Sequence, residues 1–388
     1  MPTWNVSFDL RIDLANRELQ MLLAQVHAQA QLTAGIPLPP KARRKINALH
    51  IMRAVRGTTG IEGAVLSEAE VSQIIQAPKG ESVLPSSRSR EEQEVRNAEE
   101  VMRFVADTDE PVITEDLIRR IHELTTQRIP YEHNEPGKYR THPAQAGDYV
   151  PPREADVIND LMVRFVAWLN SREVLAWDPV VRAVAAHFYL VSIHPFGDGN
   201  GRTSRALESL LLYRGGINVT GFYSLSNYYY QHRSEYVEML DHVRFKSGGE
   251  LTSIILFAAR ALTRELAEVT ATVIETVKII SFRDYARERL LGPDGPGQKT
   301  GMRRFQLLSA ILDLPEFRTA SARVATEGLR KLYGRLTPRT VQRDAEALLD
   351  MALVTVEAGT LKPNLAALDE FTARGLAQRA LVGTSPDP

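Results

Sequence analysis

The residues between His194 and Arg202, HPFGDGNGR, combine an imidazole, a carboxylate and a guanidinium with three glycines at alternate positions. Glycine is used where the backbone adopts unusual angles or where another group must approach it closely. The order does not match G-x-G-x-x-G after a strand, the dinucleotide-binding motif, and no lysine follows as in a P-loop. The stretch therefore needs another explanation for three glycines beside an acid and a base.

Helical spacing on both sides places this stretch between two predicted helices. The first amides of a helix have no intrahelical partners and lie at the positive end of its dipole. The amides of Gly199, Asn200 and Gly201 are therefore expected to form an anion-binding nest. Arg202 and Arg205 are three residues apart, so they share a helix face and can reach the same phosphates.

Two further side chains complete a candidate reaction centre. Asp198 is a hard oxygen ligand beside the nest and suits Mg²⁺ on a polyphosphate. His194 has an ordinary pKa of about 6.5 and suits proton acceptance at neutral pH. A lone His is more often a helix cap and a lone Asp-Gly more often a turn. Their co-location favours a site that binds a nucleotide and deprotonates an attacking hydroxyl.

The longer stretch HPFGDGNGRTSR resembles the Fic-domain motif, H-P-F-x-[DE]-G-N-G-R-x-x-R, and matches every defined position. The resemblance implies a nucleotidyltransferase that moves AMP from ATP onto a Tyr, Thr or Ser hydroxyl of a target protein or of itself. By position, it implies these roles: His194 as general base, Phe196 as buried anchor, Asp198 as Mg²⁺ ligand, Gly199, Asn200 and Gly201 as the anion hole, Arg202 on the phosphates and Arg205 on the γ-phosphate.

The segment TTGIEG, from Thr58 to Gly63, resembles the inhibitory motif of the same family, [ST]-x-x-x-E-[GN]. In that interpretation Glu62 forms a bidentate pair with Arg205, which then cannot receive the γ-phosphate. An ordinary helix-capping pattern is the alternative. The resemblance favours an autoinhibited enzyme.

Two other segments carry weaker resemblances. PGKYRTHPAQAGDYVPP resembles the flap that covers the site and pins the target by strand pairing. It departs from many relatives in having Pro143, Ala144 and Ala146, and Pro143 offers no amide for such pairing. LSNYYYQHRSEYVEML resembles the segment that lines the nucleoside pocket, which would involve Asn227, Tyr228 and Tyr236; aromatic packing in a helical core is the alternative.

The C-terminal region contains three short helical patterns followed by TVEAGTLKPN, which suits a small hairpin. This order resembles winged-helix regulators. Thr337 would cap the last helix with Pro338 in its first position, and Arg339, Thr340 and Arg343 would face DNA. Basic residues outnumber acidic ones by only three between 301 and 362, so a protein-interaction module that makes a homodimer is the alternative.

Whole-chain composition limits the remaining choices. The 388 residues allow two or three domains, and 44% hydrophobic residues suffice for substantial cores. The net charge of −1 gives no global field toward nucleic acid or membrane. No cysteine is present, no signal peptide is recognised, and no apolar run of about 18 residues occurs. We therefore expect a cytoplasmic protein without membrane contact.

The predicted fold is mainly α. It has a Fic helical core with a short β-hairpin flap, an N-terminal helical extension, and a C-terminal winged helix of three helices plus a small β wing. The apolar helix at 178–193 should be its buried centre. The expected division is 1–100, the N-terminal helical region with the inhibitory motif; 101–290, the catalytic core; 291–301, a linker; 302–375, the winged-helix module; and 376–388, a disordered tail.

Three functions follow from these patterns. The first is an Mg²⁺-dependent, autoinhibited AMP transferase. The second uses the same site to remove AMP, with Glu62 orienting water, or to transfer another nucleotide. The third is a DNA-binding regulator in which the Fic core senses a nucleotide. The intact motif favours catalysis, because a sensor does not need the histidine base.

Overall fold

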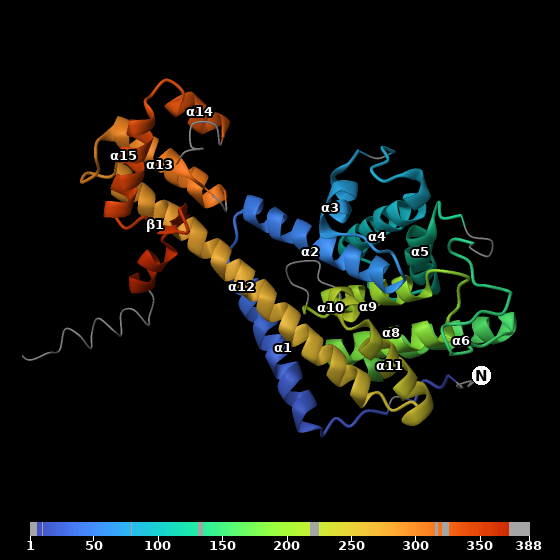
Figure 1. Ribbon diagram of the computed structural model, residues 1–388. Coiled ribbons are helices and arrows are strands. Elements are labelled where there is room, and N and C mark those ends of the chain that lie inside the picture. The colour runs from blue at the N-terminus through green and yellow to red at the C-terminus, as the bar shows by residue number, and fades with distance from the viewer. Residues whose placement is uncertain are drawn as a thin grey trace, which may run out of the picture. The chain divides into compact units, whose positions relative to one another are not determined.

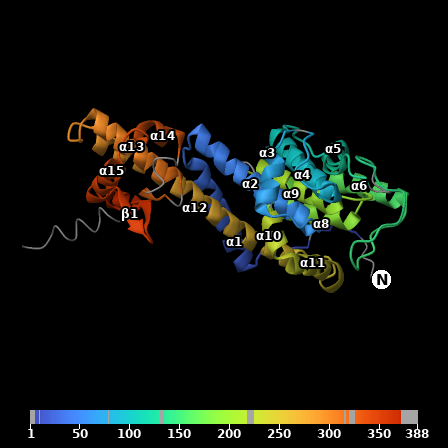
Figure 2. The same ribbon diagram turned by 45° about the horizontal axis from the view of Figure 1, so that its top comes forward.

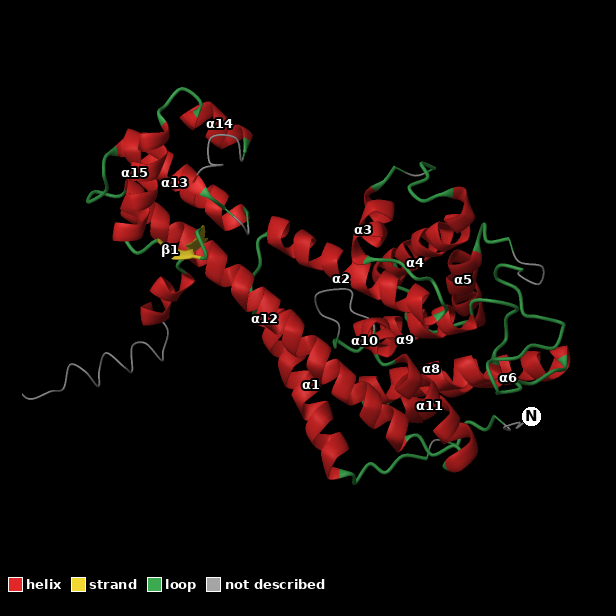
Figure 3. Cartoon of the chain, viewed as in Figure 1, coloured by secondary structure: helices red, strands yellow, loops and turns green. Residues whose placement is uncertain are grey.

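The computed structural model describes residues 6–9, 11–78, 80–130, 135–217, 225–314, 317–319 and 326–371. Helices make up most of this part, and Figure 3 shows them in red beside one small hairpin in yellow. The predicted mainly α fold is confirmed.

The elements up to residue 246 are α1 (Arg17–Gly35), α2 (Pro40–Ile61), α3 (Glu68–Gln76), η1 (Ser86–Arg88), α4 (Ser89–Asp107), α5 (Glu115–Thr126), α6 (Ala155–Leu169), α7 (Arg172–Leu175), α8 (Pro179–Ile193), α9 (Asn200–Arg214), α10 (Ser226–Gln231), α11 (Arg233–Asp241) and η2 (His242–Lys246). The later elements are α12 (Thr252–Leu291), α13 (Gln298–Asp313), α14 (Glu327–Tyr333), α15 (Pro338–Asp350), β1 (Val354–Glu357), β2 (Thr360–Pro363) and η4 (Leu365–Phe371).

The chain divides into two compact units, residues 1–273 and 274–388, and the division falls within α12. The second unit starts before the linker predicted at 291–301, because the last turns of α12 bury Phe282, Ala286 and Leu290 in its core. The other predicted domain limits stay predictions. The tail predicted at 376–388 lies outside the described residues.

Helix α8 is the buried centre of the first unit, as its sequence predicted. Its side chains from Val180 to Ile193 are buried, apart from Arg182. The helix starts where it does because the Asp178 carboxylate accepts the Val180 amide at 2.8 Å, and Pro179 needs no partner in the first position. Because the helix is buried along its length, its C-terminal end at His194 has a defined position, and the motif begins there.

Helices α2, α4 and α5 pack against α9 and bring three distant segments to the motif. Figures 1 and 2 show these helices gathered around α8 and α9 from two directions. The packing places residues 58–62, 90–94 and 122–126 beside the motif loop, whose first residue, His194, lies 68 to 136 positions further along the chain.

The segment before α6, predicted as a loop or irregular hairpin, has little regular structure. One antiparallel bridge joins Ala146 to Tyr149, with both amides bonded across it at 3.0 and 3.1 Å. Tyr149 is buried, and its hydroxyl donates to the Ser192 carbonyl at 2.8 Å. The hairpin is short and one end of it is fixed to the last turn of α8.

The second unit has the predicted order of helices followed by a hairpin. Strand β1 pairs antiparallel with β2, from Val354 opposite Pro363 to Glu357 opposite Thr360. Ala358 and Gly359 both have positive φ, 48° and 75°, as the tight turn requires. Part of the middle helical pattern, residues 320–325, lies outside the described residues. That this arrangement is a winged helix stays a prediction.

Helix α15 begins as its sequence suggested, with one difference. Pro338 occupies the first position and Thr337 the N-cap, but the Thr337 hydroxyl pairs with the Thr340 hydroxyl at 3.2 Å and makes no cap bond to the backbone. Arg339 and Arg343 are exposed. Among the described residues, no helix is both long and apolar enough to cross a bilayer.

Candidate functional site

The motif forms a short loop between two helices, α8 and α9, that pack against each other. His194 closes α8 in the left-handed conformation, φ 52°, with its amide bonded to the Leu190 carbonyl at 3.0 Å. Gly199, also left-handed at φ 73°, is the N-cap of α9. Two left-handed residues reverse the chain within five positions, and the start of α9 faces the end of α8.

Asn200 closes the loop with its side chain. Its Oδ1 accepts the Phe196 amide at 2.9 Å, and its Nδ2 donates to the Phe196 carbonyl at 2.8 Å. Phe196 is fully buried and stacks on His122, with ring centroids 3.7 Å apart. The predicted anchor thus lies in the core, and the Asn200 side chain shapes the loop while its amide lies at the helix start.

Two glycines at the start of α9 have no room for a side chain. A Cβ on Gly199 would lie 2.5 Å from Thr126 Cγ2. A Cβ on Gly201 would overlap the Glu62 carboxylate. Because the first amides of α9 lack intrahelical acceptors, this bare backbone is suited to oxyanions. The Glu62 carboxylate already lies against it.

Arg202 lies on the first turn of α9 and is 5% exposed. Its Nη1 lies 3.3 Å from Glu94 Oε1, and its Nη2 donates to Asp198 Oδ1 at 3.2 Å. Nε and Nη1 have no hydrogen-bond acceptor among the described residues. A buried guanidinium with unsatisfied N–H groups favours an anionic ligand, because such groups are costly to leave unpaired.

Asp198 is partly exposed and is held by two guanidiniums. Its Oδ1 accepts the Gly199 amide at 2.7 Å, and its Oδ2 accepts Arg90 Nη2 at 3.2 Å. No group of three or more His, Asp or Glu side chains among the described residues forms a metal centre. One carboxylate still fits Mg²⁺, which commonly takes one or two carboxylates and completes its shell with phosphate and water.

The His194 side chain is half-buried and has a defined tautomer. Its Nδ1 lies 3.3 Å from the Val191 carbonyl, which can only accept, so Nδ1 carries the proton and Nε2 keeps a lone pair. Burial is the main cause that lowers its pKa to about 4, and the charges of Arg140 and Arg244 add to it; the Val191 carbonyl and Glu62 act in the opposite direction. At neutral pH the imidazole is a proton acceptor.

Arg140 is a residue of this site that sequence reasoning missed. It is 4% exposed, and its guanidinium donates to three carbonyls: His194 at 2.8 Å, His142 at 2.7 Å, and Pro152. It therefore ties both ends of the irregular segment to the backbone of the histidine. Its partners are all backbone atoms, so no pattern of side-chain types could have revealed them.

The far N-terminal segment meets the motif at Arg205, which is 1% exposed. Arg205 Nη2 donates to Glu62 Oε1 at 2.7 Å, while Nε and Nη2 donate to the Thr58 hydroxyl and carbonyl at 3.0 and 3.1 Å. The expected bidentate pair with Glu62 is not formed, because Thr58 occupies Nε and shares Nη2. Burial alone raises the pKa of Glu62, but Arg205 and Arg202 outweigh it and leave that pKa below its ordinary value.

The glycines around Glu62 have physical reasons. Gly63, at φ 108°, ends α2 with amide bonds from Gly63 to Gly60 and from Ala64 to Thr59, the pattern of a Schellman cap. A Cβ on Gly60 would lie 2.5 Å from the Tyr230 ring. The segment therefore ends a helix and does not begin one, and its glycines admit α10 and direct Glu62 toward α9.

The three residues predicted for the nucleoside pocket do not form one group. Asn227 Nδ2 donates to Glu265 Oε1 at 3.2 Å, and Tyr228 stacks on His232 at 4.0 Å. Tyr236 lies beside Arg205, whose charge acts against the effect of burial on the pKa of the Tyr236 hydroxyl. Residues 218–224, which precede α10, lie outside the described residues.

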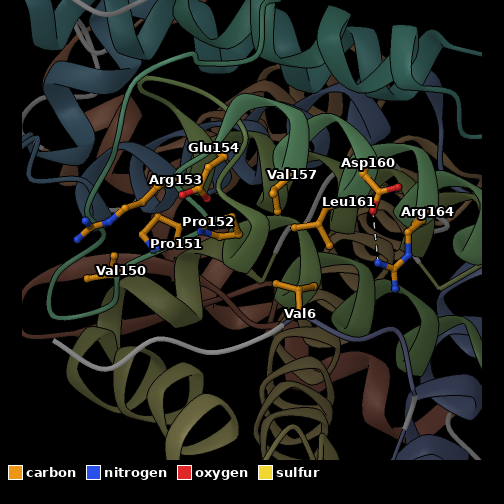
Figure 4. A pocket seen from close by; sticks show the side chains of 10 residues that line it. All are labelled: Val6, Val150, Pro151, Pro152, Arg153, Glu154, Val157, Asp160, Leu161 and Arg164. Carbon is orange, nitrogen blue, oxygen red and sulfur yellow. Dashed lines mark hydrogen bonds and ion pairs between the residues drawn. The ribbon is translucent and has the colours of Figure 1, made fainter.

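A cavity of about 450 Å³ opens beside the end of the irregular segment (Figure 4). Its wall includes Val150–Glu154 and side chains of α6, with the Asp160–Arg164 pair at one end. None of the motif residues lines it.

Comparisons with known proteins agree with this geometry. Residues 112–212 match the Fic/DOC family. The protein adenylyltransferase Fic of Culex quinquefasciatus is 32% identical over 250 residues, which are 63% of this chain and 44% of that protein. The protein of the same name from Aedes aegypti is 32% identical over 232 residues, 58% of this chain and 42% of that protein. The chain thus spans less than half the length of these relatives.

Solved structures support the fold. Fic-1 of C. elegans has a TM-score of 0.51 at 24% identity, with 65% of this chain and 71% of that one aligned. A Fic family protein from Desulfovibrio desulfuricans G20 has a TM-score of 0.54 at 19% identity, with 94% of this chain and 98% of that one aligned. Residues 112–212, which contain the motif, thus match the Fic/DOC family in sequence, and the chain shares the fold of the two solved Fic proteins.

Proposed function

We propose that this chain is an Mg²⁺-dependent protein adenylyltransferase of the cytoplasm that Glu62 restrains. The hydroxyl oxygen of a Tyr, Thr or Ser on a target protein, or on the chain itself, attacks the α-phosphorus of ATP. The bond between the α-phosphorus and the bridging oxygen breaks, and pyrophosphate leaves. The proton of the attacking hydroxyl passes to His194 Nε2, which has the free lone pair.

The start of α9 is the phosphate site in this proposal. The first amides of α9 and the unsatisfied N–H groups of Arg202 offer donors to phosphate oxygens. Asp198 would hold Mg²⁺, which supplies charge neutralisation on the polyphosphate when bound. Arg205 would contact the γ-phosphate once Glu62 has left it.

Glu62 supports the autoinhibitory part of the proposal. Its carboxylate neutralises Arg205 and lies against the bare backbone at Gly201, where a phosphate oxygen would bind. A second negative charge at that place repels the γ-phosphate. The two relatives from Culex and Aedes carry the name protein adenylyltransferase, which agrees with this activity.

One observation carries the proposal: His194, a proton acceptor at neutral pH, precedes the start of α9, where the Glu62 carboxylate lies against the backbone that would bind phosphate. To test it, wild-type, Glu62→Gly and His194→Ala proteins are incubated with an equal mixture of nucleoside triphosphates and Mg²⁺, followed by intact-mass spectrometry. We expect an AMP adduct that increases in Glu62→Gly and is absent when His194→Ala is added to it. A Glu62→Gly protein without any nucleotide adduct on itself or on lysate proteins would contradict the proposal.

Removal of AMP is the second candidate, and the position of Glu62 is the observation that favours it. The carboxylate lies beside the cradle and could orient a water toward a bound AMP ester. Wild type would then release AMP from a protein that the Glu62→Gly variant has modified, and Glu62→Gly itself would not. The adduct mass in the first experiment also reports whether another nucleotide is preferred.

For the second unit we propose a winged-helix module that binds DNA through α15. The exposed side chains of Arg339 and Arg343 support this. The full chain should bind duplex DNA less tightly as salt rises, and Arg339→Ala with Arg343→Ala should weaken that binding. Equal binding by the double variant, together with a concentration-dependent dimer, would favour the interaction-module alternative.

A further inference from the structure

A chain of buried polar side chains, separate from the inhibitory segment, leads to the neighbourhood of Arg205. His187 Nδ1 lies 2.9 Å from Glu208 Oε1, and His187 Nε2 lies 2.9 Å from the Tyr236 hydroxyl. Tyr229 donates its hydroxyl to the same Glu208 oxygen at 3.0 Å. All four side chains are at most 3% exposed. The chain ends at the Tyr236 hydroxyl, which lies close enough to Arg205 for each group to influence the other electrostatically.

Only one arrangement of protons in a neutral imidazole satisfies this chain. The Glu208 carboxylate accepts, so His187 Nδ1 must donate to it. His187 Nε2 then accepts the proton of the Tyr236 hydroxyl. The lone pairs of the Tyr236 oxygen remain for Arg205, which can only donate. In that arrangement each bond has one direction, and the Tyr236 oxygen keeps lone pairs beside the guanidinium.

The contacts of Arg205 differ in origin. Thr58 and Glu62 both belong to the inhibitory segment at the end of α2. Tyr236 belongs to α11 and is supported by α8 and α9 through His187 and Glu208. A displacement of the inhibitory segment removes or weakens the first two contacts but not the third. An arginine side chain that loses its anchors gains rotamer freedom, which opposes phosphate binding.

We propose that Tyr236, oriented by His187 and Glu208, is a positioning residue that keeps Arg205 directed at the γ-phosphate when Glu62 has left. The inference rests on the proposed function. It changes the role suggested by the sequence, because Tyr236 then acts on phosphate recognition through Arg205 and not on the nucleoside.

The test measures γ-phosphate recognition separately from general nucleotide binding. The Glu62→Gly variant is titrated calorimetrically with α,β-methylene-ATP and with α,β-methylene-ADP, neither of which can be cleaved at the reacting bond. We expect tighter binding of the triphosphate by about tenfold. Adding Tyr236→Phe should reduce that ratio to about twofold and leave the affinity for the diphosphate within twofold.

Tyr229→Phe in the same background is the matched control. It removes the tyrosine hydroxyl that donates to Glu208, from a ring that stacks on Tyr236 with centroids 4.6 Å apart, and should keep the tenfold ratio. If Tyr236→Phe leaves the ratio of triphosphate to diphosphate affinity unchanged, the inference is overturned while the proposed function stands. An equal loss of both nucleotides would also overturn it, since this indicates a general structural role. If Glu62→Gly binds neither nucleotide, the proposed function fails as well.

Discussion

Two arginine–carboxylate clusters, one in each unit, differ in how completely the carboxylate is enclosed. In the second unit Asp344 is fully buried and accepts Arg303 at 2.6 and 3.0 Å, Arg304 at 3.2 Å and Tyr333 at 3.0 Å. In the first unit Glu62 gives one oxygen to Arg205, and its side chain is 36% exposed. All acceptor positions of Asp344 are used, whereas Glu62 keeps free acceptor positions that face solvent.

The difference teaches what separates a structural ion pair from an exchangeable one. Asp344 joins α13, α14 and α15, and every bond it loses leaves a buried charge unpaired. Glu62 stands on a helix end, where it can leave Arg205 and be replaced by another anion. Tyr236, which does not belong to the inhibitory segment, stays beside the arginine in that exchange. The open cluster suits regulation because its partner is replaceable.

The largest expected effect concerns the closed cluster. Asp344→Asn should lower the free energy of unfolding of the second unit by about 3 kcal/mol, because Arg303 and Arg304 lose their counter-charge. The pKa of Asp344 lies below its ordinary value: burial raises it, but the bonds from Arg303, Arg304 and Tyr333 prevail. The contribution is therefore complete above about pH 4 and is lost as the pH falls further.

Calorimetric unfolding of the full chain checks this, with Asp350→Asn on the exposed face of α15 as control. The control should change stability by less than about 0.5 kcal/mol. Equal stabilities of the two variants would show that the Asp344 cluster is not what holds these helices together.

The next effect concerns the open cluster. Glu62→Gln removes the charge but keeps the shape, so auto-modification should rise about tenfold, as expected for roughly 1.4 kcal/mol of lost competition. The free energy of unfolding should change by less than about 1 kcal/mol, because the carboxylate is more than a third exposed. Initial rates of AMP incorporation and a denaturant titration measure the two quantities. A loss of stability as large as that of Asp344→Asn would erase the distinction between the clusters.

A smaller effect should appear in the pH dependence. The lowered pKa of His194, about 4, means that its imidazole is neutral well below pH 6.5. In the Glu62→Gly variant, activity should stay level from neutral pH down to roughly pH 5 and fall below it. Removal of Glu62 withdraws an influence that raises this pKa, so the acid limb cannot move upward. A half-maximal rate near pH 6.5, with circular dichroism unchanged, would contradict the neutral-base assignment.

The smallest effect concerns the other carboxylate of the site. Arg90 is 47% exposed and pairs with Asp198 Oδ2, so it competes with a cation there. Arg90→Ala should increase the affinity for Mn²⁺ in the presence of α,β-methylene-ATP about threefold, as a partly screened charge pair predicts. Electron paramagnetic resonance of free Mn²⁺ measures it. Arg103→Ala, on the same helix but paired with Glu99, is the control and should leave the affinity unchanged.

Much of the fold and of the site followed from local patterns. The apolar run at 180–193 placed the central helix, and the Gly-Asn-Gly sequence placed the start of α9. The capping box formed by Ser67 and Glu70 would also have located α3, since both of its bonds are present. These features depend on residues within a few positions of one another, so the sequence carries them directly.

Contacts between distant segments could not be obtained in that way. Arg90 and Glu94 reach the motif because α4 packs on α9, and nothing in their own helix distinguishes them from other surface charges. Arg140 binds carbonyls, which every residue has. Tyr236 was predicted to touch the nucleoside, and the packing of α11 places it on Arg205.

The sequence by itself determined the candidate reactive groups and their local order: the proposed base, the proposed metal ligand, the proposed phosphate cradle and a carboxylate proposed to compete for Arg205. Local geometry sufficed, because helix ends and glycine turns are set by neighbouring residues. The tertiary structure alone decided which partners each group has. Burial and hydrogen bonds between distant segments arise only when helices far apart in the chain pack together. They set the charge of His194, the pairing of Asp198 with Arg90 and the pairing of Arg205 with Glu62.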